Sequence, residues 1–265
     1  MTLKRTAWST ALGVVVPVLV AGLAAVAAGD SAPRKPRGSS PEYKAALATV
    51  EAMARAKAPS VASGTVSDGR LENPSELPAR GFGYKPSSPA RKTHFGTDEM
   101  VFGLIELAAY IQERRPGSPW LSIGDISGPR GGKLDPHINH QDGQDLDLSF
   151  FYCTPDGQPV DRGWMKCDAA GKTKQAGVVF DDARNFELLV LWLESPYFGG
   201  CEWILVSEPL EKRLVEYGRS LAKKMPKKSE PILERTAELE RLMREPSSSP
   251  HDDHFHIRLK RIGKK

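Results

Sequence analysis

Two short segments alternate strictly between apolar and polar residues, which is typical of a β-strand with one buried face. In the segment 145–150 a strand would bury Leu146 and Leu148 and would turn Asp145 and Asp147 to the opposite face. This pattern predicts a strand that carries two carboxylates on one side and part of the core on the other.

The segment 254–259 follows the same rule near the other end of the chain. His254, His256 and Arg258 would share one face of a strand, while the apolar residues between them would pack into the core. If the two strands were neighbours in one sheet, their polar faces would come together and could hold a metal ion.

The rest of the chain alternates between helix and strand patterns. Thr97 can cap a helix that has acidic residues in its first turn and apolar residues at three- and four-residue spacing. Other helices are expected over Pro41–Ala58, Asp182–Glu194, 209–226 and 230–245, and other strands over Trp120–Ile126 and Trp203–Val206. We therefore expect an α+β fold, with a small, mainly antiparallel sheet and helices packed on one face.

Five of the six histidines lie in two clusters, over residues 137–147 and 251–256. Either cluster alone could be a solvated polar face of a strand. Together they supply two imidazoles and a carboxylate for one ion, an open coordination position, and spare histidines to move protons, which is what a catalytic zinc centre requires. Gly143 suits a tight bend that lets His140 fold back toward Asp147. A structural zinc site would normally use cysteine, and no cysteine lies near either cluster.

The order of these residues resembles a known family. His140 and Asp147, followed much later by His254-x-His256, resemble the LAS metallopeptidases, whose fold is of the hedgehog type and carries the zinc site on the sheet. The fuller patterns His-x-x-His-Gln-x-Gly-x-Asp-x-Asp and His-x-x-His-x-His are similar to those of penicillin-insensitive murein endopeptidases. The likeness covers roughly residues 80 to 262 and includes the segments Thr93–Gly96, Ile123–Ser127 and Trp203–Ser207.

The resemblance implies roles for particular residues. Zinc would be held by His140, Asp147 and His256, and His254 and His251 would handle the proton or the transition-state charge. His137 would lie near the cleft.

Three aspartates, Asp145, Asp252 and Asp253, could orient the imidazoles of the ligands, although solvated carboxylates are an equally good interpretation of the last two. Arg258 would share the metal-facing side and could meet either a substrate carboxylate or Asp145.

The function that the resemblance implies is zinc-dependent hydrolysis of the D-Ala–meso-diaminopimelate cross-links of peptidoglycan. A D-Ala-D-Ala carboxypeptidase would use the same zinc site, but it needs a closed pocket for a free carboxylate where an endopeptidase needs an open groove. A non-catalytic wall-binding module is a third alternative. The spare histidines argue against it, because binding alone needs no proton transfer.

The start of the chain has the plan of a secretory signal peptide. Lys4 and Arg5 precede an uncharged stretch from Ala11 to Ala28 that ends in small residues. We expect cleavage before Gly29, a periplasmic location and no membrane span after cleavage; an uncleaved anchor is the alternative. The expected organisation is a signal peptide over 1–28, a linker with one helix over 29–78, and a zinc metallopeptidase domain over 79–265.

Three cysteines in an exported chain leave one without a partner. Cys153 and Cys167 flank a loop rich in turn residues and could form a disulfide, or all three cysteines could be reduced.

The net charge of +4 and the pI of 8.9 come from scattered residues with no basic and aromatic interleaving, so we expect no nucleic-acid partner. No phosphate-binding glycine loop and no His-Glu-x-x-His motif occur in the sequence.

Overall fold

The computed structural model describes residues 40–198, 200–246 and 249–260, so the expected signal peptide and the first part of the expected linker lie outside the described residues. The described helices are α2 (Pro41–Ala56), α3 (Asp98–Arg114), α4 (Asp182–Glu194), α5 (Glu208–Lys224) and α6 (Ser229–Leu242). None of these helices is long and apolar enough to cross a membrane.

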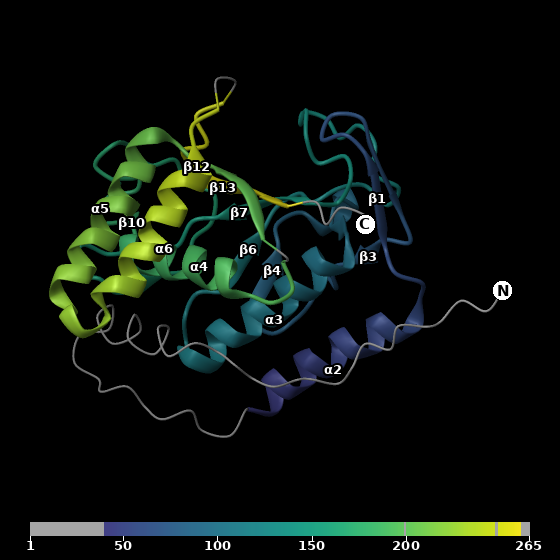
Figure 1. Cartoon of the computed structure of the whole chain (residues 1–265), viewed down its shortest axis with the longest axis horizontal. Coiled ribbons are helices and arrows are strands. Elements are labelled where there is room, and N and C mark those ends of the chain that lie inside the picture. The colour runs from purple at the N-terminus through teal and green to yellow at the C-terminus, as the bar shows by residue number, and fades with distance from the viewer. Residues whose placement is uncertain (1–39, 199, 247–248, 261–265) are drawn as a thin grey trace.

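A mixed sheet of six strands forms the centre of the described structure. Its order is β12 (Met243–Arg244), β11 (Cys201–Leu205), β13 (His254–Leu259), β7 (Asp145–Ser149), β6 (Leu121–Ile123) and β4 (Tyr84–Pro86). The three inner pairings are antiparallel and the pairing at each edge is parallel. The predicted α+β class is therefore confirmed. Figure 1 shows α3 and α4 below this sheet, α2 below α3, and α5 and α6 to the left.

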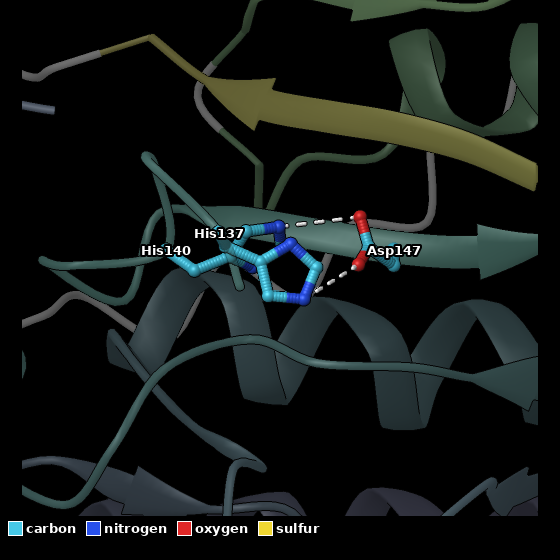
Figure 2. A group of neighbouring side chains, drawn as sticks. All are labelled: His137, His140 and Asp147. Carbon is cyan, nitrogen blue, oxygen red and sulfur yellow. Dashed lines mark ion pairs between the residues drawn. The ribbon is translucent and has the colours of Figure 1, made fainter. Parts of the chain in front are cut away.

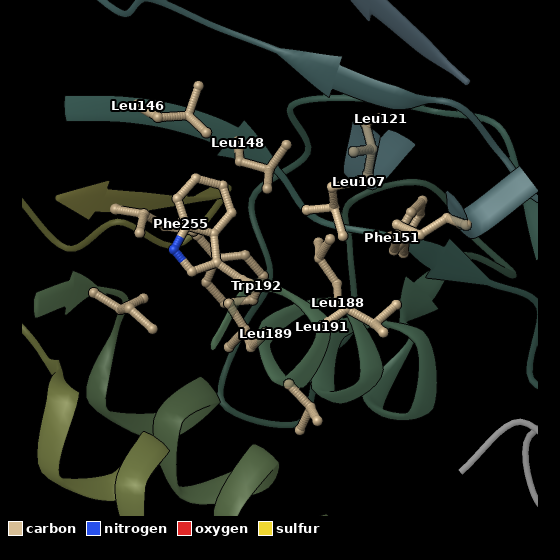
Figure 3. Close-up of a cluster of buried hydrophobic side chains, with 14 of the residues drawn as sticks. Leu107, Leu121, Leu146, Leu148, Phe151, Leu188, Leu189, Leu191, Trp192 and Phe255 are labelled. Atoms are coloured by element: carbon tan, nitrogen blue, oxygen red, sulfur yellow. The ribbon is translucent and has the colours of Figure 1, made fainter. Parts of the chain in front are cut away.

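The apolar face of the two alternating strands packs against α4. Leu146 and Leu148 of β7 and Phe255 of β13 have no exposed surface, and Figure 3 shows Trp192 and Leu189 of α4 directed toward them. Burying a large apolar side chain contributes roughly 1.5–3 kcal/mol, so this layer holds the two strands in register and leaves their polar faces on the other side.

Helix starts agree with the capping residues in the sequence. The Thr97 hydroxyl accepts a hydrogen bond from the backbone N–H of Met100 at 3.4 Å, and α3 begins at Asp98 as predicted. The Asp181 carboxylate caps α4 in the same way, by accepting from the N–H of Arg184 at 2.9 Å. α4 spans the predicted residues.

The helix predicted before the linker forms as α2 and packs on α3. The Tyr43 hydroxyl donates to Glu106 Oε1 at 3.0 Å, and the Ser40 N–H donates to the carboxylate of Glu113. Ala46 and Val50 of α2 belong to the hydrophobic core. α2 is therefore part of the folded unit.

Residues 59–78 were expected to be a polar linker, but they contain three short strands. β1 (Val61–Gly64) and β2 (Gly69–Glu72) form a hairpin, and β3 (Ser75–Glu76) pairs with β5 (Phe95–Gly96). Such short strands have no apolar alternation of their own, and their pairing with distant residues holds them in place. Residues 61–76 are therefore folded.

A small second sheet, β10 (Val179–Phe180), β8 (Tyr152–Cys153) and β9 (Pro159–Val160), follows the main one. The structure has Cys153, Cys167 and Cys201 as free thiols, which corresponds to the second of the two alternatives, three reduced cysteines. Cys153 is held in β8, and the Cys167 thiol instead donates to the carbonyl of Met165 at 3.8 Å. Burial raises the pKa of both thiols to about 12.

Candidate metal centre

The polar faces of β7 and β13 meet at one place on the sheet. The two strands are antiparallel neighbours, and their register sets His256 opposite Asp147 and Arg258 opposite Asp145. Because opposite residues on one face lie close together, the pairing brings the two sequence clusters into one site although more than a hundred residues separate them.

His140 reaches this site from the loop that precedes β7. Its backbone φ is +64°, and Gly143 follows with a φ of +75°. A Cβ at Gly143 would lie 2.7 Å from Leu71 Cδ2, so the bend needs glycine both for its conformation and for its close packing. The fold-back of His140 toward Asp147 is as predicted, and the His140 side chain has no exposed surface.

Figure 2 shows the imidazoles of His137 and His140 next to each other, with each ring facing one oxygen of the Asp147 carboxylate. Its Oδ1 is 3.2 Å from His140 Nε2, and its Oδ2 is 3.8 Å from His137 Nε2. Ligand atoms of these three residues all lie within 4.8 Å of one another, which makes them a candidate metal site.

His140 Nε2 and Asp147 Oδ1 are buried, and neither has a hydrogen-bond partner among the described residues. Leaving such atoms unpaired costs free energy, so native proteins rarely do it. A cation bound at about 2.0–2.2 Å from each atom would satisfy both, and tetrahedral coordination would separate the two ligand atoms by about 3.3 Å. The residues present therefore fit a bound metal ion.

Two further histidines approach the same carboxylate oxygen from β13. His254 Nε2 lies 3.5 Å from Asp147 Oδ1, and His256 Nδ1 lies 3.7 Å from it. His256, the third ligand expected from the sequence, thus lies beside the compact group of His137, His140 and Asp147 and not within it.

Hydrogen bonds to the second ring nitrogen decide which nitrogen of each histidine is free to accept a metal or a proton. His140 Nδ1 donates to the carbonyl of Ile126 at 2.9 Å, so Nε2 is the nitrogen that can bind a metal once the ring has lost its second proton. His256 Nε2 donates to Asp145 at 3.0 Å, so its Nδ1 keeps the lone pair that faces Asp147.

His137 differs from His140 and His256, because its nitrogen that faces Asp147 already donates a hydrogen bond to another residue. Its Nε2 donates to Asp125 Oδ2 at 3.1 Å. Asp125 is itself held by Arg91 at 2.8 Å and by the hydroxyl of Thr93. Sequence reasoning had not assigned a role to Asp125, although it stands in a segment that carried the family resemblance.

Asp145 links the site to a buried arginine. Its second oxygen accepts from Arg258 Nη1, and Arg258 also binds Asp142 through both terminal nitrogens. Arg258 is 3% exposed, so it contacts Asp145 and does not face a substrate. Burial would raise the pKa of Asp145, but the hydrogen bond from His256 and the positive charges of His140 and Arg258 outweigh it and lower the pKa.

His254 and His251 have different hydrogen-bond partners. His254 Nδ1 donates to Asp253 at 2.5 Å, which leaves its Nε2 directed at Asp147. The His251 ring is 4.8 Å from the His254 ring, and its Nδ1 donates to the carbonyl of Ser249. Asp252 instead forms an ion pair with a lysine, Lys166, at 3.2 Å.

The charged groups of this cluster shift one another's pKa values. Burial alone would lower the pKa of His140, but the Asp147 carboxylate outweighs it and raises the pKa to about 9. Burial would likewise raise the pKa of Asp147, but the neighbouring histidines hold it well below its usual range. Burial and the positive charge on His140 lower the pKa of His256 to about 4, so His256 is a neutral imidazole, the form that binds metals.

Trp164 forms a wall of the site that sequence reasoning missed. Its ring lies 5.6 Å from the His254 ring, and its Nε1 donates to the hydroxyl of Ser122 at 3.1 Å. The indole covers Gly124, where an added Cβ would lie 2.5 Å from it. Trp164 also has a backbone φ of +58°, a strained conformation that often marks functional sites. A lone tryptophan after a glycine was the only signal in the sequence.

Comparison with known proteins agrees with this geometry. No curated protein matches the chain significantly. Residues 62–185 match the penicillin-insensitive murein endopeptidase family, and this region contains His137, His140 and Asp147 but ends before β13. Over residues 62–185 the chain belongs to the penicillin-insensitive murein endopeptidase family, and it is a peptidase of that family.

Proposed function

We propose that this protein is a zinc-dependent endopeptidase that cleaves the D-Ala–meso-diaminopimelate cross-links of peptidoglycan. The observation that carries the proposal is the buried pair His140 Nε2 and Asp147 Oδ1, which approach to 3.2 Å without hydrogen bonds among the described residues. Mixed nitrogen and oxygen ligands with an open position are typical of catalytic zinc.

The third ligand is His256 and not His137. His256 presents a free Nδ1 toward Asp147, and its other nitrogen is oriented by Asp145 in the carboxylate–histidine–metal arrangement. His137 donates its nearest nitrogen to Asp125 and therefore lines the cleft instead of binding the ion.

The remaining residues have proton-handling roles. When bound, zinc would lower the pKa of a coordinated water toward about 7 and polarise the scissile carbonyl. His254, held by Asp253, presents Nε2 to accept a proton from the attacking water. His251 lies next to His254 and delivers a proton to the departing amine. Trp164 covers one side of this region and limits the entry of other water.

Peptidoglycan is the substrate that the family implies, and the cross-link is the bond whose cleavage defines an endopeptidase. Export is part of the proposal, because a secreted chain would meet this polymer in the periplasm. The signal-peptide pattern at residues 1–28 supports it.

The decisive experiment is digestion of purified peptidoglycan, followed by separation of the muropeptides with and without a chelator. We expect cross-linked dimers to become monomers, activity to return when zinc is added back, and elemental analysis to find one zinc per chain. The matched control is His140→Ala, which removes one ligand and should lose both the metal and the activity. β-Lactams should not inhibit, because no serine is acylated.

Other outcomes would reject the proposal in defined ways. Release of terminal D-Ala with intact dimers would identify a carboxypeptidase. Bound zinc without any metal-dependent change in the muropeptides would identify a wall-binding module.

A further inference from the structure

Trp120 is a large apolar side chain on the surface of the metal-bearing face of the sheet. It is 43% exposed, whereas its neighbour Leu121 is buried in the core. Side chains alternate along a strand, so Trp120 shares its face with Ser122. The Ser122 hydroxyl contacts Trp164 of the metal centre, which identifies this face as the one that carries Asp147.

The segment Pro159–Trp164 crosses this face between Trp120 and the metal centre. The Asp161 carboxylate pairs with Lys85 at 2.6 Å, and the backbone N–H of Trp164 donates to the hydroxyl of Ser149 at 3.0 Å. These contacts attach the segment to β4 and β7 on the two sides of β6. The segment therefore has a defined position next to Trp120.

A surface hollow of about 320 Å³ lies between this segment and the start of β6. Trp120 lines it together with Pro159, Asp161, Gln112 and Ser118. The hollow thus combines the face of an indole ring with a carboxylate and an amide at its edges. Small-molecule sites have this composition: apolar and aromatic walls with a few polar groups.

We propose that this hollow binds an N-acetylated sugar of the peptidoglycan strand to which the cleaved peptide is attached. A sugar ring has an apolar face that can lie on the indole and hydroxyl and acetamido groups that can meet Asp161 and Gln112. The inference rests on the proposed function, because it assumes that a peptide cross-link occupies the metal centre.

The spacing agrees with this assignment. Ile123 pairs with Leu148, which places Gly124 beside Asp147 and Trp120 four residues further along the sheet. At about 3.3 Å per residue, Trp120 lies roughly 13 Å along the sheet from the level of Asp147. A peptide stem of roughly four residues spans a similar length when extended, so a stem that is cleaved at the metal and runs over the segment Pro159–Trp164 reaches the level of the hollow with its sugar end.

The test compares two cross-linked dimers, one carrying its disaccharides and one from which they have been removed enzymatically. In the zinc-loaded full chain, Trp120→Ala should raise KM for the glycan-bearing dimer by ~10-fold relative to KM for the glycan-free dimer. Trp120→Phe should restore most of the difference, because it keeps an aromatic face. The matched control is Leu233→Ala on α6, since Leu233 is equally exposed at 44% and lies on another element.

Each result decides the inference. An equal change for both dimers, or no change for either, would overturn the sugar site and leave the endopeptidase function intact. If the wild-type protein cleaves neither dimer, the proposed function fails. Saturation-transfer NMR with the free N-acetylglucosaminyl-N-acetylmuramic acid disaccharide then decides the site: a signal that Trp120→Ala removes supports it, and an unchanged or absent signal rejects it.

Discussion

The carboxylate of Asp145 lies 3.0 Å from Nε2 of His256, and this contact determines which nitrogen of the imidazole is directed toward Asp147. Arg258 binds the other oxygen of Asp145 and fixes the carboxylate in turn. A chain of buried charges therefore leads along one face of the sheet from Arg258 to the metal centre, and it holds the proposed third ligand before any ion arrives.

Asp145→Asn should weaken zinc binding by ~10–100-fold, because the amide is a poorer acceptor for the His256 N–H and no longer compensates the charge of Arg258. Competition with a chelating dye measures the affinity directly. The matched control is Asp253→Asn, which changes the partner of His254 in the same way and should leave zinc affinity nearly intact. Equal affinities for the two variants would contradict the assigned third ligand.

His254→Ala should keep the metal and lose turnover by about 10²–10⁴-fold, the usual contribution of a general acid–base group. The expectation follows from the position of His254, whose Nε2 faces Asp147 while its Nδ1 is held by Asp253. Metal analysis and kcat on one preparation check it. A zinc-free variant would make His254 a ligand, and a fully active one would move its role to His251.

Zinc binding to the metal-free protein should release protons at pH 7.5. The pKa of His140 is raised to about 9, so the ring is protonated at that pH and must lose its proton to bind zinc. The affinity should consequently rise with pH up to about 9 and fall in acid. Calorimetry in buffers of different ionisation enthalpy counts the protons, and a buffer-independent heat would contradict the expectation.

Gly124→Ala should destabilise the fold by about 1–3 kcal/mol and lower the activity, because the new methyl would lie 2.5 Å from the Trp164 ring and 2.9 Å from Asp147 Cβ. Gly128→Ala is the matched control, because its Cβ would have 3.6 Å to its nearest neighbour. Thermal unfolding monitored by tryptophan fluorescence compares the two. Equal midpoints would show that Trp164 does not pack on Gly124.

Local patterns in the sequence were enough to predict several elements of the fold. The period-two alternation over β7 and β13 and the capping residues before α3 and α4 are interactions within a few neighbouring residues, and these elements form at or near the expected places. The spacing of His140, Gly143 and Asp147 likewise predicted the bend that brings the first two ligands together, because a loop this short leaves few alternatives.

Contacts between distant segments decided the remaining strands and the details of the site. The short strands of residues 61–76 form because they pair with each other and with β5, which no local pattern reveals. The free thiols of Cys153 and Cys167, the contact of Trp164 with Ser122, and the partners of each histidine also depend on the packed chain. The family resemblance implied that His256 binds the metal and that His137 lies near the cleft, but it did not say which carboxylate each ring would meet. Only tertiary structure assigns Asp125 to one and Asp145 to the other, because a hydrogen bond to a ring nitrogen requires a partner brought there by the fold.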